Sequence, residues 1–319
     1  MNSSIQSWVE EIRRGNPRAL ARAITSVENR DERSHELLRS LFEHSGKSRI
    51  IGVTGSPGAG KSTLVDALAR EYRKRQKTIG IIAVDPTSPF SGGAILGDRI
   101  RMSSHYADPG IFIRSMATRG ALGGLSHTTA DIATLLDASG RDLVIIETVG
   151  VGQDEIDIVR LADVTMVILV PGMGDDVQSI KAGIMEIADV FVINKADRDG
   201  AERVEREIRA MQSLAHPRSD NWTPPVVKTV ASDGTGVPEL AAAVESYEKF
   251  LDSTELGRQR RMENWRNRLI AMLRDELLER VLRQQMSDDD ATRYAAEVAQ
   301  HKRDPYTLID EIIRKFNGK

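Results

Sequence analysis

A glycine-rich segment holds the residues in this chain whose types and spacing most clearly imply chemistry. Residues 55–62 read Gly-Ser-Pro-Gly-Ala-Gly-Lys-Ser and fit the pattern G-x-x-x-x-G-K-[ST] at every fixed position. Glycines let a backbone wrap tightly and point its N–H groups at phosphate oxygens, while the lysine adds a cation and the serine a hydroxyl for magnesium. The segment predicts a nucleoside triphosphate site. Its expected phosphate contacts are Gly55, Ser56, Pro57, Gly58, Ala59, Gly60, Lys61, Ser62 and Thr63.

A second polar motif follows the apolar run Val190–Ile193 and reads Asn-Lys-Ala-Asp, the N-K-x-D pattern of GTPases. Guanine presents two adjacent N–H donors, and a carboxylate can accept both. Adenine would leave the carboxylate unpaired, so we expect Asp197 to select guanine. Asn194 is expected to tie neighbouring loops together, and the stem of Lys195 to cover the base. Ser232 follows the next predicted strand and resembles the last base-contacting loop of GTPases.

Two other predicted strands end in carboxylates, Asp85 and Glu147. Acidic residues at such strand ends can hold Mg²⁺ or its waters beside a γ-phosphate. The long polar loop over residues 86–105 adds Asp98, a candidate for a magnesium-bound water or for a general base. We therefore predict Mg²⁺ as cofactor, with Ser62, Asp85, Asp98 and Glu147 as its candidate ligands.

The sequence does not show a full set of residues that would activate the attacking water. Gly150 occupies the place of the glycine in the D-x-x-G motif, whose N–H can bind the γ-phosphate. Many small GTPases place a water-orienting glutamine next, where this chain has Val151. Gln153 is a candidate substitute. We expect slow intrinsic hydrolysis that a partner completes through the loop 172–181, with Lys181 as a candidate catalytic cation.

These residues require a scaffold that brings strand ends together, and the apolar pattern supplies one. Continuous short apolar runs alternate with amphipathic stretches, as expected for strands that are covered on both faces. We predict an α/β fold with a doubly wound, mostly parallel sheet that binds its ligand at the carboxyl ends of the strands. The runs are Ile50–Val53, Ile79–Val84, Ile111–Ile113, Leu143–Ile146, Val164–Val170, Val190–Ile193 and Val226–Val230.

Helical patterns flank this region on both sides. Near the N-terminus, apolar residues recur at helical spacing, and Asn16 before Pro17 is typical of a helix start. Near the C-terminus, Trp265, Leu269 and Leu273 belong to a second apolar stripe. We predict three parts: an N-terminal helical extension (1–46), a P-loop GTPase domain (47–252) and a C-terminal helical arm (253–319).

Composition excludes several other classes of protein. The 319 residues carry a net charge of −3 and no cysteine, so neither nucleic-acid binding nor cysteine-based metal or thiol chemistry is expected. The N-terminal residues lack a basic, apolar secretory signal, and no apolar run approaches the ~20 residues that span a bilayer. We therefore expect a cytoplasmic protein without a membrane partner.

The motifs together resemble one family, the methylmalonyl-CoA mutase-associated GTPases (MeaB/ArgK, MMAA-like). The resemblance covers roughly residues 8–285. Its more specific parts are Val84-Asp-Pro-Thr-Ser-Pro89 and the segment Pro171–Lys181, which resembles an additional switch loop of the family. It implies a GTP-hydrolysing chaperone of an adenosylcobalamin-dependent acyl-CoA mutase, which gates cofactor loading and protects or reactivates the mutase. It also implies a homodimer held by a C-terminal helical dimerisation arm.

Other functions remain open at this stage. A nickel-insertion metallochaperone needs a metal site, and six scattered histidines without cysteine offer a poor one. A protein-targeting GTPase would concentrate methionines in a groove, which this chain does not do. An amino-acid transport-related kinase would need a phospho-acceptor that the sequence does not reveal. A non-catalytic nucleotide-binding regulator is disfavoured by the intact Lys61, Ser62 and Glu147.

Overall fold

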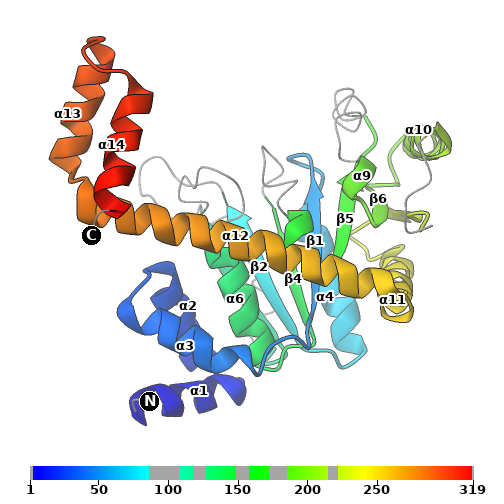
Figure 1. Ribbon diagram of the computed structural model, residues 1–319. Coiled ribbons are helices and arrows are strands. Elements are labelled where there is room, and N and C mark those ends of the chain that lie inside the picture. Colours follow the sequence, from blue (N-terminus) through cyan, green and yellow to red (C-terminus); the bar gives the residue numbers. More distant parts are fainter. Residues whose placement is uncertain are drawn as a thin grey trace. The chain divides into compact units, whose positions relative to one another are not determined.

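The structure is a computed structural model that describes residues 3–85, 108–117, 127–148, 158–172, 185–214 and 222–317. Within these ranges, seven strands pair in parallel in the order β3-β2-β4-β1-β5-β6-β7 (Figure 1). The strands are β1 (Arg49–Gly55), β2 (Ile79–Asp85), β3 (Ile111–Ala117), β4 (Leu143–Glu147), β5 (Val164–Leu169), β6 (Val190–Asn194) and β7 (Val226–Thr229). Every apolar run that predicted a strand is a strand, and the parallel sheet is confirmed.

The register brings the strands that end in Asp85 and Glu147, two of the predicted magnesium ligands, to one edge of the sheet. Glu147, the last residue of β4, lies level with Val53 of β1 and Ala83 of β2. Asp85 ends β2 and Gly55 ends β1, each two residues beyond that level. Since all strands run in the same direction, the glycine-rich loop and both carboxylate-bearing strand ends meet at the carboxyl edge.

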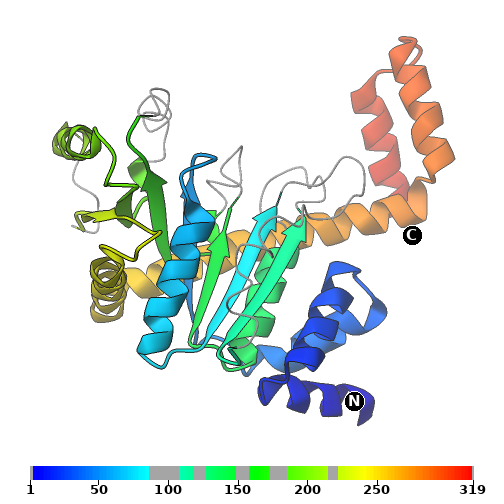
Figure 2. The same cartoon turned by 180° about the vertical axis from the view of Figure 1, so that it is seen from behind.

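Helices cover both faces of the sheet, which accounts for the continuous apolar runs. On one face, α4 (Lys61–Lys74) and α11 (Val237–Ser253) pack over β1 and its neighbours, as Figure 2 shows for α4. On the other face lie α6 (His127–Ala138) and α10 (Ala201–Leu214). Within β4, Ile145 belongs to the first core, whereas Val144 and Ile146 belong to the second. Two short segments, η2 (Ile158–Arg160) and α9 (Met185–Ile187), complete the connections that the structure describes.

Three helices precede the sheet and join the core around α6. They are α1 (Ser3–Arg13), α2 (Pro17–Glu28) and α3 (Glu32–Phe42). Asn16 caps α2 by accepting from the N–H groups of Arg18 at 3.0 Å and Ala19 at 3.2 Å. Ile5 and Ile12 of α1 are buried, as the helical spacing predicted. The N-terminal helical extension is therefore confirmed.

The chain divides into two compact units, Met1–Arg261 and Met262–Lys319. The long helix α12 (Glu255–Gln285) begins in the first unit and continues into the second. The second unit adds α13 (Asp288–Ala299) and α14 (Pro305–Asn317), and a capping box between Ser287 and Asp290 starts α13. The predicted boundaries at residues 46 and 252 remain predictions. None of the helices in the described ranges is long and apolar enough to cross a membrane.

Candidate functional site

The glycine-rich loop connects β1 to α4 and packs closely against its neighbours. Gly55, Gly58 and Gly60 have φ angles of +142°, +79° and +84°, which favour glycine. A Cβ on Gly55 would clash with the carbonyl oxygen of Ile168, and one on Gly60 would lie 2.6 Å from Nδ2 of Asn194. The close approach of β5 and of the Asn194 side chain therefore explains why two of these positions hold glycine.

Lys61 brings a buried cation to this loop. It is the first residue of α4 and is only 6% exposed. Its ammonium donates to the carbonyl oxygens of Gly55 at 2.6 Å and Ser56 at 3.1 Å. The N-terminal end of α4 adds partial positive charge at the same place. Together they give the loop the charge and the N–H donors that suit phosphate oxygens.

Ser62 and Glu147 contact each other beside the loop. The Ser62 hydroxyl donates to Oε1 of Glu147 at 2.7 Å, and both side chains are buried. Asp85 belongs to the neighbouring strand, and its backbone lies at the same edge of the sheet. A hydroxyl and carboxylates at one strand edge are the oxygen donors that Mg²⁺ prefers. The residues that the structure describes therefore fit a magnesium ion.

Asn194 connects three loops from the end of β6. Its Nδ2 donates to the carbonyl oxygen of Ala59 in the glycine-rich loop at 2.9 Å. Its Oδ1 accepts from the Thr229 hydroxyl and from the Ala231 N–H, each at 3.2 Å. The side chain thus ties the segment expected to read the base to the segment expected to hold the phosphates, as the sequence predicted.

The remaining residues of the N-K-x-D motif lie at the surface beside this junction. Lys195 has a left-handed φ of +55°, and its ammonium donates to the carbonyl oxygen of Gly58 at 2.7 Å. Its stem therefore runs towards the glycine-rich loop. Asp197 is exposed, and so is Ser232 in the turn after β7. Asp197 lies two residues after Lys195, and its exposed carboxylate is accessible to a ligand.

Four predicted site residues lie outside the described part of the chain: Asp98, Gly150, Gln153 and Lys181. Their predicted roles therefore rest on the sequence alone. For Asp85, the structure describes the backbone but not the side chain. Lys61, Ser62, Glu147 and the base motif are the part of the predicted site that the structure brings together.

Threonines that the sequence analysis did not single out support this site. Thr229 binds Asn194 through its hydroxyl, and its carbonyl accepts from the Ala196 N–H at 3.0 Å. Thr148 follows Glu147 and donates through its hydroxyl to the Thr54 hydroxyl at 3.2 Å. Each threonine is buried in the last residues of a strand or directly after it. A threonine at the carboxyl end of a predicted strand, or directly after it, was the sequence signal that could have indicated them.

Among the residues that the structure describes, no group of three or more His, Cys, Asp or Glu side chains could hold a metal ion on its own. The pair Ser62 and Glu147 is smaller than such a group. A magnesium ion here would therefore need further oxygen ligands, which phosphate groups and water supply in nucleotide sites.

Both the sequence and the fold are similar to those of known proteins. A family model described as methylmalonyl Co-A mutase-associated GTPase MeaB matches residues 20–286. A protein of Pyrococcus abyssi is 45% identical over 98% of this chain and 97% of its own length. The GTPase ArgK of Escherichia coli is 36% identical over 92% of this chain and 89% of its own.

Among solved structures, a crystal structure titled LAO/AO transport system kinase has a similar fold. It is 27% identical, with a TM-score of 0.73, and the match covers 99% of each chain. The similarity therefore extends over the helices that come before and after the sheet in the chain, as well as over the sheet itself.

Proposed function

The chain belongs to the family of methylmalonyl-CoA mutase-associated GTPases, and from that premise we propose how it binds its nucleotide and which partner it serves. Its relatives are GTPases, and this chain is a GTP hydrolase of the P-loop class that binds a guanine nucleotide.

We propose that the loop from Gly55 to Thr63 holds the phosphates of GTP and GDP. Lys61 would neutralise charge that grows on the β–γ bridge and the γ-oxygens in the transition state. The ammonium is already at the loop, held by two carbonyl oxygens that compete weakly with an anionic phosphate. Binding of nucleotide would therefore exchange neutral acceptors of the Lys61 ammonium for charged ones.

We propose that Mg²⁺ binds beside the Ser62 hydroxyl, with Glu147, Asp85 and Asp98 holding it directly or through water. The 2.7 Å contact between Ser62 and Glu147 supports this, because both oxygens lie beside the loop that would hold the phosphates. When bound, the ion would neutralise phosphate charge. From the sequence alone, we also propose that Gly150, Gln153 and Lys181 contact the γ-phosphate or the attacking water.

We propose that the segment Asn194–Asp197, with Ser232, reads the guanine base. The observation that carries this assignment is the hydrogen bond from Asn194 to Ala59, which joins the base motif to the phosphate loop. A ligand seated on the loop would have its base close to Lys195 and Asp197. Asp197 is exposed and carries the two acceptor oxygens that the guanine edge requires.

Substitution of Asp197 by Asn tests this reading directly. The amide offers a donor where guanine also offers one, so affinity for GDP should fall about a hundredfold or more. Xanthosine diphosphate presents an acceptor at that position, and its affinity should rise. Competition binding measures both, and Asp199→Asn, a nearby exposed aspartate, is the matched control. If Asp197→Asn keeps the selectivity of the wild type for guanine, Asp197 does not read the base.

We further propose that the chain is a chaperone of an adenosylcobalamin-dependent acyl-CoA mutase of the methylmalonyl-CoA type. It would gate cofactor loading and protect or reactivate the mutase, using GTP in the cytoplasm. The family description names that association. Val151 supports it, because it stands where many small GTPases place a water-orienting glutamine. The mutase would complete the site through the loop 172–181.

A homodimer is part of this proposal. On α12, large apolar side chains are exposed along a helix of 31 residues. The exposed apolar residues of α12 are Met262, Trp265, Leu269, Ile270, Met272, Leu273, Leu277, Leu278 and Leu282. Such a surface is costly in water, and a second copy of the helical arm would cover it.

One alternative has a specific observation in its favour. The solved structure that covers 99% of this chain carries a title that names a transport system kinase. A kinase would transfer the γ-phosphate to a protein side chain, whereas a hydrolase releases inorganic phosphate. Following the label of γ-³²P-GTP separates the two, because labelled protein appears only if this chain or an added acceptor is phosphorylated.

A further inference from the structure

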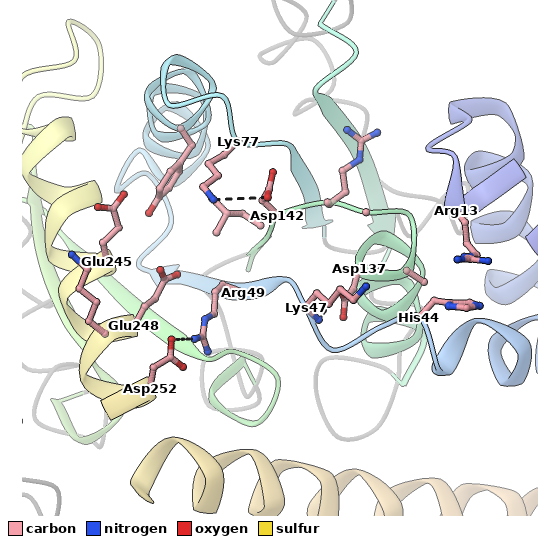
Figure 3. Close-up of a pocket in the computed structure, with 16 residues that line it drawn as sticks. Arg13, His44, Lys47, Arg49, Lys77, Asp137, Asp142, Glu245, Glu248 and Asp252 are labelled. Carbon is pink, nitrogen blue, oxygen red and sulfur yellow. Dashed lines mark hydrogen bonds and ion pairs between the residues drawn. The ribbon is translucent and has the colours of Figure 1, made fainter. Parts of the chain in front are cut away.

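A pocket of about 620 Å³ lies at the amino-terminal edge of the sheet, away from the nucleotide site (Figure 3). Arg49, which begins β1, and Leu143, which begins β4, contribute to its wall. The end of α6, Tyr72 in the last turns of α4 and part of α11 complete it. All of these residues belong to the first unit. The volume is typical of small-ligand sites, which run from about 300 to 1,000 Å³.

Two of the carboxylates in the pocket are already satisfied by neighbouring chain segments. Asp137 accepts from the backbone N–H groups of Lys47 at 3.1 Å and Ser48 at 2.9 Å. Asp142 accepts from the Thr78 N–H at 2.7 Å and from the Thr78 hydroxyl at 2.8 Å. These hydrogen bonds hold the two side chains in place, so their negative charge is largely committed to the fold.

The carboxylates on α11 are also paired with cations or partly protonated. Asp252 pairs with Arg49, as Figure 3 shows, and Glu245 pairs with Arg75. Burial raises the pKa of Glu248 to about 7, although Arg49 opposes that rise. A large part of the Glu248 side chains is therefore uncharged at neutral pH.

The cations of the pocket, in contrast, are mostly unpaired. Within the described ranges, no carboxylate lies within 4.0 Å of the charged groups of Arg13, Lys47, Arg141 or Lys249. Among the described carboxylates, Asp142 alone lies within 4.0 Å of the Lys77 ammonium, at 3.9 Å. Lys47 and Lys77 come from different segments around the opening in Figure 3. The lining therefore carries a surplus of available positive charge.

Buried hydrogen-bonding groups in the same wall also lack partners. Arg141 is 7% exposed, and its Nη1 donates to the carbonyl oxygen of Pro109 at 3.1 Å. Among the described residues, neither its Nε nor the hydroxyl of Tyr72, which is 2% exposed, has a hydrogen-bond partner. A buried donor that is left without a partner destabilises the folded protein. A ligand that draws these side chains towards the pocket would recover part of that cost.

We infer that this pocket binds a small anion that carries phosphate or carboxylate groups. Lys47, Lys77 and Arg13 would supply the charge, and Arg141 and Tyr72 would supply buried donors. The class follows from the lining, because the pocket is concave and four of its carboxylates are paired with donors or cations. The fifth, Glu248, has a buried Oε1 without a hydrogen-bond partner among the described residues but is partly neutral, and the other unpaired groups are cations and donors.

Calorimetric titration of the full-length protein tests the inference, with saturating GDP and Mg²⁺ present so that the phosphate loop is filled. The probes are inorganic phosphate, citrate and the dication putrescine. Phosphate or citrate should bind, and the stronger of the two identifies the group that the pocket prefers. The affinity should fall as salt is added, because the lysines are exposed to solvent.

The double variant Lys47→Ala/Lys77→Ala should bind the anion about tenfold more weakly or worse, since it removes two charged contacts. Both side chains are exposed, so the variant should fold. Lys302→Ala, an exposed lysine that does not line the pocket, is the matched control and should bind normally. Tyr72→Phe, which removes only the hydroxyl, should also weaken binding.

Three results would overturn the inference. The first is the absence of heat from both anions with the GDP-loaded protein. The second is equal binding by the wild type and the double variant, which would indicate an adventitious ion only. The third is binding of putrescine in place of the anions, which would assign the pocket to cations through Glu245 and Glu248.

Discussion

The contact between Ser62 and Glu147 shows what the structure adds at the scale of single residues. The two are 85 positions apart, and the sequence analysis assigned both to a magnesium ion from their types and from the strand ends they follow. It could not predict that they touch, because that depends on the order of β4 and β1 in the sheet. The same holds for Lys61, whose type indicated a phosphate contact but not the two carbonyl oxygens that hold it.

Glu248 gives a residue-scale prediction about stability and pH. Its pKa is raised from 4.5 to about 7, chiefly by burial, so the folded protein holds this proton more tightly than the unfolded chain. The stability that this group contributes is complete below about pH 4.5 and is lost as pH rises towards 7. Glutamine is neutral throughout and avoids the loss. Relative to the wild type, Glu248→Gln should therefore gain about 1 kcal/mol between pH 5 and pH 8, after allowance for partial exposure.

Urea unfolding at pH 5 and pH 8 measures this difference. Glu239→Gln, an exposed glutamate on the same helix, is the control and should behave like the wild type at both pH values. If Glu248→Gln shows the same pH dependence as the wild type, the carboxyl group of Glu248 is ionised in the folded protein and the raised pKa is wrong.

At the scale of elements, the sequence predicted most of the sheet and little of its long-range connections. The strands β4, β5 and β6 are mostly apolar runs that are buried on both faces, and that local pattern needs no knowledge of neighbours. The helix start at Asn16 was predictable for the same reason, because capping is local. The break of the C-terminal arm into α13 and α14 and the pocket at the amino-terminal edge were not predicted. The pocket depends on contacts between distant segments, whereas α13 begins at a local capping box between Ser287 and Asp290.

One such contact joins the start of α12 to the loop before β6. The Arg260 guanidinium donates to both carboxylate oxygens of Asp189, at 3.0 and 2.9 Å, and Asp189 is fully buried. The Thr165 N–H also donates to Asp189. Asp189 directly precedes the strand that ends in Asn194. The ion pair therefore fixes the first turns of α12 against the element that positions the base motif.

Removal of one partner should leave a buried charge without compensation. We expect Arg260→Met to lower the free energy of unfolding by about 3 kcal/mol, the size usual for a broken buried pair. The double variant Arg260→Met/Asp189→Asn should recover part of that loss, because the buried charge is gone.

Chemical denaturation monitored by tryptophan fluorescence supplies the measurement, and Trp222 lies close by, donating to the Asp189 carbonyl. Arg258→Met removes an exposed ion pair of the same helix and should cost less than about 1 kcal/mol. Equal losses in Arg258→Met and Arg260→Met would show that burial does not set the strength of this pair.

For the whole molecule, the exposed apolar surface of α12 predicts self-association. Leu269 and Leu273 are 59% and 60% exposed, and they lie one turn apart on the helix. In the full-length protein, Leu269→Glu/Leu273→Glu should shift sedimentation velocity from a dimer to a monomer, because two buried charges would face the partner. Nucleotide binding should persist, since the site belongs to the first unit.

Asn267→Glu places the same side chain at an exposed polar position of α12 and should leave the dimer intact. A dimer that survives the double substitution would mean that another surface joins the subunits. A wild type that sediments as a monomer would instead leave the apolar stripe without a second copy to cover it.

The rate of GTP hydrolysis with and without an adenosylcobalamin-dependent methylmalonyl-CoA mutase tests the central claim most directly. The wild type should turn over slowly alone and faster with the mutase, because the partner stabilises the loop arrangement that completes the site. Lys61→Ala should lose about a hundredfold or more in either condition, and Lys181→Ala should lose the stimulation alone. If the mutase leaves the wild-type rate unchanged, the proposed chaperone role is contradicted.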